Sequence, residues 1–355
     1  MRHVRALMLG LALIALVIAC GGYVALGELR APAAASGDPV EFVVAPGEST
    51  AAIATKLRAE GLIRQPTLFT LLARMQDLDG KLQTGHYVLS PTMTMSQIFI
   101  ALQNSRIPEA QVTLPEGLRL EEIATRLEQA GVVSADTFLA AARDGKRFRA
   151  DYFLLAALPD DASLEGYLFP DTYRFPQPTE AEQVVRTMLD RFVEQYGTIE
   201  RSVQVPGVNV HQIVTMAAIV QRESARVDEM PRVAGVFWNR LKPTNAALVS
   251  GGTLGADATV QYALGYSDAE QTWWRKDLTE ADLQVASAYN TRLRPGLPPG
   301  PIAAPGLDAL TAAAKPDDQG GYLFFVADCA RDGTHNFATS FEEFQQYEAT
   351  WLACQ

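Results

Sequence analysis

The segment HQIVTMAAIVQRESARVDEMPRVAGVFWNRL, residues 211–241, predicts two consecutive helices joined by a short charged turn. Apolar residues recur on one face of each helix, at positions 213, 216, 217 and 220 and at positions 233, 236, 237 and 241. The pattern predicts Asp228 as the N-cap of the second helix, with Pro231 in its first turn, where a missing amide donor costs nothing. Glu223 then lies in the last turn of the first helix, at the end of an apolar face.

This position makes Glu223 a candidate catalytic acid. The C-terminus of a helix carries partial negative charge, and an apolar wall disfavours an ionised group, so both raise the pKa of a carboxyl. A general acid needs such a raised pKa to hold its proton near neutral pH. Arg222 and Arg226 would act in the opposite direction. The alternative is that Glu223 is simply an exposed residue at the end of a helix.

The chain begins with an apolar segment, since residues 6–27 contain no charged side chain. A helix of this length spans roughly 33 Å, enough to cross a hydrocarbon core of about 30 Å. Arg2 and Arg5 precede it, which predicts a transmembrane helix with residues 1–5 in the cytoplasm and the remainder exported. A cleaved signal peptide or a lipidated Cys20 are alternatives, but the apolar run continues to Leu26 and favours the uncleaved anchor.

Export affects how the cysteines and charges are interpreted. Cys329 and Cys354 form an even pair in an oxidising compartment, so a disulfide and two buried thiols are both open. No C-x-x-C motif occurs and the histidines at positions 3, 86, 211 and 335 are scattered, so we expect no metal and no cofactor. A formal net charge of -11 argues against nucleic acid as a partner.

A repeat follows the predicted linker, residues 28–40. The residues after Gly47 recur seventy positions later after Gly117: Ile53, Ala54, Thr55, Leu57 and Gly61 correspond to Ile123, Ala124, Thr125, Leu127 and Gly131. Each copy predicts a strand (41–45 and 111–114), a glycine turn, and a helix that ends at a glycine. The unit resembles the lysin motif, a small module that binds bacterial wall glycan. Two similar packing units without a ligand are the alternative.

The fold class is therefore α+β. The predicted order is a transmembrane helix, a small LysM-like α/β module over residues 41–105, and a larger mixed α+β catalytic domain over residues 106–355 with a helical active-site core. Capping boxes predict helices after Thr179/Glu182 and Ser340/Glu343, a further helix opens at Asp257, and residues 322–327 form an apolar strand. Trp273 and Trp274 belong either to the core or to the wall of a cleft.

A lone acid in an exported, acidic protein suggests glycosidic cleavage. No Gly-x-Ser-x-Gly elbow and no His-Glu-x-x-His motif is present. Most glycosidases use two carboxylates. A lytic transglycosylase needs only one, because the C6 hydroxyl of the sugar takes the place of an activated water molecule.

Six motifs occur in a specific order: IVQRES (219–224), VFWNRL (236–241), DATVQY (257–262), SAYNT (287–291), GLPPGPI (296–302) and FVAD (325–328). Together they resemble the endolytic murein transglycosylases, the YceG-like, membrane-anchored lytic transglycosylases of bacterial inner membranes. The resemblance implies a periplasmic catalytic domain, with Glu223 as the catalytic acid. It also implies endolytic cleavage of the MurNAc–GlcNAc bond in nascent peptidoglycan strands, with 1,6-anhydro-MurNAc ends, termination of strand elongation, and peptidoglycan synthases as partners.

Supporting residues are predicted from the same motifs. Asn239, Tyr289 and Asn290 could hold the acetamido and hydroxyl groups of the sugar by hydrogen bonds. Asn239 is equally acceptable as a structural helix residue, and Asp257 either caps a helix or contributes to the site.

The chain departs from the family pattern at three places. Gln221 stands where the family often has glutamate, Arg292 stands where an aromatic residue usually follows, and the loop before Asp257 is longer and rich in glycine. Two other functions remain open, namely a non-catalytic, membrane-anchored peptidoglycan-binding scaffold and a lysozyme-type hydrolase.

Overall fold

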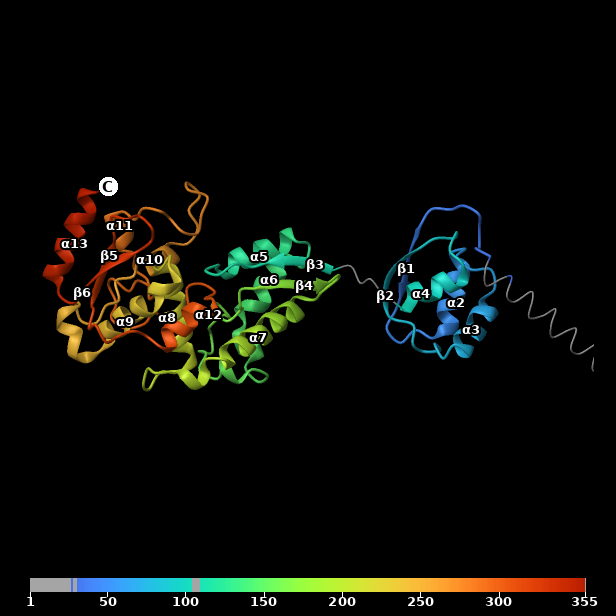
Figure 1. Ribbon diagram of the computed structural model, residues 1–355, viewed down its shortest axis with the longest axis horizontal. Coiled ribbons are helices and arrows are strands. Elements are labelled where there is room, and N and C mark those ends of the chain that lie inside the picture. Colours follow the sequence, from blue (N-terminus) through green and yellow to red (C-terminus); the bar gives the residue numbers. More distant parts are fainter. Residues whose placement is uncertain (1–26, 28–30, 104–108, 355) are drawn as a thin grey trace, which may run out of the picture. The chain divides into compact units, whose positions relative to one another are not determined.

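The structure, a computed structural model, describes residues 27, 31–103 and 109–354 (Figure 1). The chain divides into two compact units between Glu109 and Ala110. Helices dominate, and the strands of the described part pair into two-stranded sheets, so the predicted α+β class is confirmed. The predicted transmembrane helix lies outside the described residues except for Gly27. Within the described ranges no helix is both long and apolar enough to cross a membrane.

The N-terminal unit is a two-stranded sheet packed with helices. It comprises β1 (Val40–Val44), α2 (Thr50–Ala59), α3 (Pro66–Met75), β2 (Gly85–Leu89) and α4 (Met95–Gln103). The two strands are antiparallel and pair Phe42 with Tyr87. Both side chains are buried, and the core is completed by residues such as Phe69 and Phe99, whose rings stack 4.2 Å apart.

The C-terminal unit begins with the second copy of the predicted repeat. Its elements are β3 (Glu109–Thr113), α5 (Leu120–Gln129), α6 (Ala135–Arg143) and β4 (Thr172–Pro176), and β3 pairs with β4. The repeat is confirmed at its glycines, because Gly47 and Gly117 have φ of 75° and 80°, and Gly61 and Gly131 have φ of 69° and 71°. Such positive φ values are easily adopted only by glycine. The likeness to the lysin motif stays a prediction.

A cluster of helices forms the centre of the C-terminal unit. It comprises α7 (Ala181–Gly197), α8 (Val210–Glu223), α9 (Met230–Leu241), α10 (Asp257–Leu264), α11 (Glu280–Leu283) and α12 (Leu307–Ala314). Helix α8 packs against α9, α10 and α12, and is buried over most of its length (Figure 1). Short 3₁₀ helices lie at Gly145–Phe148, Phe153–Leu155, Glu200–Ser202, Val227–Glu229 and Pro243–Leu248. Both helices predicted for residues 211–241 are confirmed.

Two predicted helix starts are wrong. Helix α9 begins at Met230 and has no side-chain cap, because Asp228 binds the guanidinium of Arg226 instead. Helix α7 begins after Glu180, also without a side-chain cap. The hydroxyl of Thr179 donates to the carbonyl of Pro176, and the carboxylate of the expected partner, Glu182, forms ion pairs with Arg147 and Arg186.

The chain ends in a small hairpin and a helix. Strands β5 (Phe324–Ala327) and β6 (His335–Ala338) are antiparallel, and α13 (Phe341–Ala353) packs against both. Ser340 caps α13 by accepting from the backbone N–H of Glu343, but the carboxylate of Glu343 accepts from the Thr339 N–H, so the predicted capping box forms only in part. Cys329 and Cys354 form a disulfide with a Cα–Cα distance of 6.0 Å, so the bridged alternative holds.

Candidate active site

Glu223 lies where the ends of two helices meet. It is the last residue of α8, as predicted, and its side chain is partly buried. Its Oε1 accepts a hydrogen bond of 3.0 Å from the backbone N–H of Ala258, in the first turn of α10. The negative end of one helix and the positive end of another therefore act on the same carboxyl group.

The surroundings of Glu223 bring its pKa close to neutral. Burial raises the pKa of Glu223 to about 7, against the opposing effect of the Ala258 N–H. The negative charge of Asp257 adds to the increase, whereas Arg292 and Arg222 act against it. The predicted effects of burial and of Arg222 are thus confirmed, but Arg226 is paired with Asp228. Near neutral pH the carboxyl can both hold and release a proton, as an acid that later acts as a base requires.

Charged residues from three segments surround this carboxyl. Arg292 Nε donates to Asp257 Oδ1 at 2.6 Å. Arg240, one residue after Asn239, donates from Nε to the carbonyl of Leu323 at 2.6 Å. Burial lowers the pKa of Arg240 to about 10, although the charge of Glu223 opposes this. Sequence reasoning did not identify Arg240 as a neighbour of the site.

Asp257 does not cap α10. It is the first residue of the helix, the N-cap is Ala256, and no side chain makes a capping hydrogen bond there. Its carboxylate is occupied by Arg292. The capping alternative is wrong because Ala256 occupies the N-cap position and the carboxylate of Asp257 pairs with Arg292 instead. Asp257 therefore contributes to the site as a paired negative charge beside Glu223.

The side chains of the two predicted asparagines form hydrogen bonds with the backbone of the protein. Asn239 is 3% exposed and donates from Nδ2 to the carbonyl of Tyr322 at 3.1 Å. Asn290 is fully buried and donates from Nδ2 to the carbonyls of Leu283 and Val285. Both amide groups therefore have backbone partners, and direct contact of either residue with a sugar stays a prediction.

Tyr289 lines a cavity of about 450 Å³ together with His211 and a second buried carboxyl, Glu165. Glu165 Oε2 accepts hydrogen bonds from the Leu120 N–H and the Tyr262 hydroxyl, while Oε1 has no partner among the described residues. Burial raises the pKa of Glu165 to about 8, so this group is largely protonated at neutral pH. Glu165 lies between Leu164 and Gly166 at a turn, and no spacing in the sequence identified it.

A second group of side chains links Glu223 to an aromatic cavity. The guanidinium of Arg222 lies 3.7 Å from the ring centre of Trp274, and Trp274 Nε1 donates to Glu122 Oε2 at 3.0 Å. The neighbouring Trp273 stacks with Arg119 at 4.4 Å. Such cation–π contacts hold flat groups in fixed orientations.

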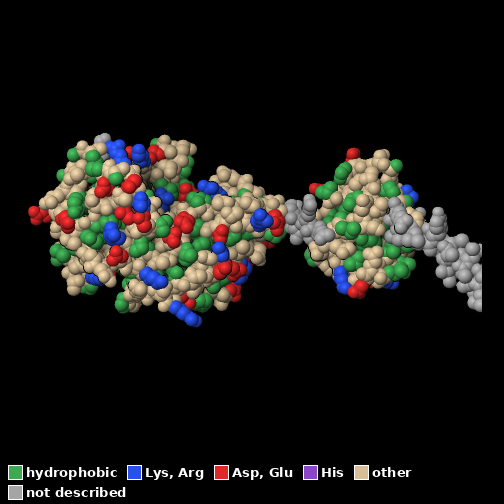
Figure 2. Space-filling view, viewed as in Figure 1, with side chains coloured by type: hydrophobic (Ala, Val, Ile, Leu, Met, Phe, Trp, Pro, Cys, Tyr) green, Lys and Arg blue, Asp and Glu red, His purple; other side chains and the backbone are tan. Residues whose placement is uncertain are grey.

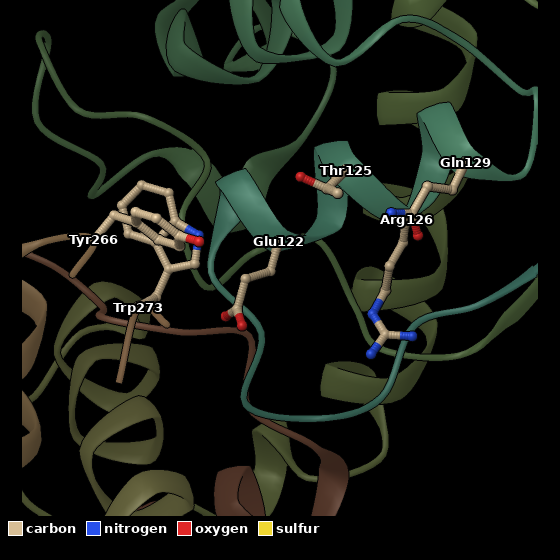
Figure 3. A pocket seen from close by; sticks show the side chains of 6 residues that line it. All are labelled: Glu122, Thr125, Arg126, Gln129, Tyr266 and Trp273. Carbon is tan, nitrogen blue, oxygen red and sulfur yellow. The ribbon is translucent and has the colours of Figure 1, made fainter. Parts of the chain in front are cut away.

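The two tryptophans therefore have different roles. Trp273 forms a wall of a cavity of about 570 Å³, together with Tyr266 and one face of α5 (Figure 3). Trp274 is a structural contact between α5 and the end of α8.

Positive and negative side chains are interspersed over the visible face of the C-terminal unit (Figure 2). The arginines near Glu223 are thus a local group of positive charges in a chain whose net charge is negative. In the ranges that the structure covers, no group of three or more His, Cys, Asp or Glu side chains is placed to hold a metal ion.

Comparison with known proteins gives related results for sequence and structure. Residues 42–350 match the YceG-like family. A Bacillus subtilis (strain 168) protein named endolytic murein transglycosylase is 30% identical over 302 residues, covering 81% of this chain and 78% of that protein. A Streptococcus pneumoniae (strain D39) protein of the same name is 28% identical over 350 residues, covering 92% of this chain and 62% of that protein. The chain therefore spans less than two thirds of the length of this second relative.

A crystal structure provides an independent comparison. A YceG-like protein from Listeria monocytogenes superimposes with a TM-score of 0.56 and 28% identity, covering 88% of this chain and 99% of that chain. The family match includes every motif from which the resemblance was predicted, together with Glu223 and the helices that hold it. The chain belongs to the YceG-like family.

Proposed function

We propose that this protein is a lytic transglycosylase that cleaves peptidoglycan strands, with Glu223 as its acid and base. The observation that carries the proposal is a single carboxyl, with a pKa near 7, held between the C-terminus of α8 and the N-terminus of α10. The names of the Bacillus and Streptococcus relatives support the same substrate and reaction.

The reaction needs one proton to move twice. Protonated Glu223 gives its proton to the glycosidic oxygen as the bond from that oxygen to C1 of the muramic sugar breaks. The resulting carboxylate is stabilised by the Ala258 N–H. The C6 hydroxyl of the same sugar then bonds to C1, and its proton passes to Glu223. No water is consumed, and the acid is restored.

The neighbouring carboxylate, that of Asp257, has a different role. Asp257 is paired with Arg292, so it is not free to activate a water molecule as the second carboxylate of a hydrolase does. Its negative charge instead raises the pKa of Glu223. This division of roles favours the transglycosylase over the lysozyme-type hydrolase.

We extend the proposal to where and how the enzyme acts. Cleavage within nascent strands at MurNAc–GlcNAc bonds, formation of 1,6-anhydro-MurNAc ends and termination of elongation follow from the family resemblance. So does activity beside peptidoglycan synthases. The apolar residues 6–27 after Arg2 and Arg5 support a single-pass inner-membrane anchor with the catalytic unit in the periplasm.

Replacing the acid tests the proposal. Glu223→Gln keeps the shape of the side chain but removes the titrating proton, so turnover of purified glycan strands by the full chain should fall about 10²–10⁴-fold. Glu280→Gln, an exposed residue of α11, is the matched control and should turn over normally. Thermal melting of both variants checks folding. Unchanged turnover in a folded Glu223→Gln protein would exclude Glu223 as the catalytic acid, and no turnover by the unsubstituted chain would support the non-catalytic scaffold.

A further inference from the structure

The cavity beside α5 has an aromatic wall held by a tight turn. Tyr266 and Trp273 stand edge to face, with ring centres 5.2 Å apart. The turn that carries them is closed by a hydrogen bond of 2.8 Å from the Ser267 N–H to the Thr272 carbonyl. Tyr266 is 40% exposed. An exposed aromatic face in a cavity of about 570 Å³ suits the C–H face of a sugar ring, which is apolar on one side and ringed by hydroxyls.

The opposite wall is polar and comes from one face of α5. Glu122, Thr125, Arg126 and Gln129 line the cavity, and their spacing of three and four residues places them on the same side of a helix (Figure 3). Glu122 Oε2 accepts from the Arg119 N–H and from Trp274 Nε1, which fixes the carboxylate in place. Its Oε1 accepts no hydrogen bond from the described residues and remains available to a hydroxyl group.

Arg126 adds a positive charge to this wall. Its side chain is exposed and makes no ion pair with any described residue. Figure 3 shows Arg126 and Glu122 extending from α5 toward the same side. A guanidinium binds carboxylates through two parallel hydrogen bonds. A free guanidinium in a chain with a net charge of -11 therefore favours an acidic ligand at this place.

Contiguous side chains connect the cavity to the acid. Trp273 is followed by Trp274, which stacks on Arg222, and Arg222 precedes Glu223. These contacts join the turn that carries Trp273 to the end of α8, the helix whose last residue is Glu223.

We propose that this cavity is a binding subsite for a pyranose that carries a carboxylate. The aromatic wall of Trp273 and Tyr266 contacts the apolar face of the ring, Glu122 accepts from a ring hydroxyl, and Arg126 pairs with the carboxylate. In peptidoglycan that carboxylate comes either from the stem peptide or, on a muramic sugar without a peptide, from the lactyl group. The proposal rests on the proposed function for the class of substrate, but it concerns binding and not cleavage.

Binding to the full chain in detergent tests the subsite, with Glu223→Gln as the parent so that ligands stay intact. The probes are a GlcNAc–MurNAc tetrasaccharide with stem peptides, the same tetrasaccharide after an amidase has removed the peptides, and chitotetraose, which has no carboxylate. We expect Trp273→Ala to weaken binding of all three probes about tenfold or more. Losing a hydrogen bond to a charged group costs about 1.5–3 kcal/mol, so Arg126→Gln should weaken only carboxylate-bearing probes, by at least about tenfold.

Two further comparisons identify the source of the carboxylate and control for nonspecific effects. The lactyl carboxylate is free only after the amidase has removed the peptide, so weaker binding of the peptide-free muramic probe alone to Arg126→Gln indicates the lactyl carboxylate. Weaker binding of the peptide-bearing probe alone indicates the stem peptide, and weaker binding of both indicates that Arg126 pairs with either carboxylate. Arg201→Gln and Phe153→Ala remove an exposed arginine and an aromatic side chain that is 64% exposed, and should bind like the parent. The subsite proposal is overturned if folded Arg126→Gln and Trp273→Ala proteins bind all probes normally, or if the parent binds none. Neither result depends on whether Glu223 is the catalyst.

Discussion

At the scale of single residues, the proposed acid–base chemistry depends on the environment of Glu223. The sequence was sufficient to place this residue in the last turn of an apolar helix, because that depends on local periodicity. It was not sufficient to predict that the Ala258 N–H donates to Glu223 or that Asp257 pairs with Arg292. Those contacts arise from the packing of α10 against α8, which tertiary structure decides.

Two substitutions should move the pKa of Glu223 in opposite directions. A general acid is active when protonated, so kcat/KM should fall as pH rises through the pKa of Glu223. Arg292→Gln removes a cation that lowers this pKa and leaves Asp257 unpaired, so the fall should shift to higher pH. Asp257→Asn removes an anion that raises it, so the fall should shift to lower pH. Measured pH–rate profiles, with Arg201→Gln as the control, would contradict this explanation if both variants shifted the same way.

At the scale of elements, local signals were reliable and signals that compete with distant partners were not. The glycines of the repeat were predictable because a positive φ is a local requirement. The Thr179/Glu182 capping box was wrong because Arg147 and Arg186 engage Glu182 instead. The cavity could not be predicted at all, since its link from Trp274 to Glu122 joins residues 152 positions apart.

The two copies of the repeat provide a matched pair of glycines. Gly47→Ala and Gly117→Ala both place a Cβ at positive φ, which should lower the free energy of unfolding by about 1–2 kcal/mol. At Gly47 the added Cβ meets nothing within 4 Å, but at Gly117 it lies 3.2 Å from Arg222 Nη1. Only Gly117→Ala should therefore also reduce cleavage, by displacing the residue before Glu223. Equal cleavage by the two variants, with denaturant melts confirming the fold, would exclude this link.

At the scale of the whole molecule, the structure divides into two units with separate cores, whereas the predicted domain bounds stay a prediction. The repeat was visible in the sequence, whereas the pairing of Cys329 with Cys354 was left open there, because cysteine spacing alone does not decide it. A disulfide is typical of proteins outside the reducing cytoplasm, which supports export.

Export predicts a definite topology. In spheroplasts, added protease should digest the catalytic unit, and its extraction from membranes should require detergent. This expectation follows from the proposal that Arg2 and Arg5 retain the N-terminus in the cytoplasm while residues after 27 are translocated. A soluble cytoplasmic protein serves as the control for intact membranes. Protection of the C-terminus from protease in sealed spheroplasts would rule out this orientation.

The identity of the newly formed strand ends distinguishes a transglycosylase from a hydrolase. With one acid–base carboxyl and Asp257 occupied by Arg292, the attacking group should be the tethered C6 hydroxyl, whose effective concentration exceeds that of a free reactant. Purified glycan strands should be digested by the full chain in heavy-oxygen water, and the products analysed by mass. If the enzyme is a transglycosylase, we expect 1,6-anhydro-MurNAc ends that are one water lighter than hydrolysis products and carry no heavy-oxygen label. Reducing ends that carry the heavy oxygen would contradict it and show that the enzyme is a hydrolase.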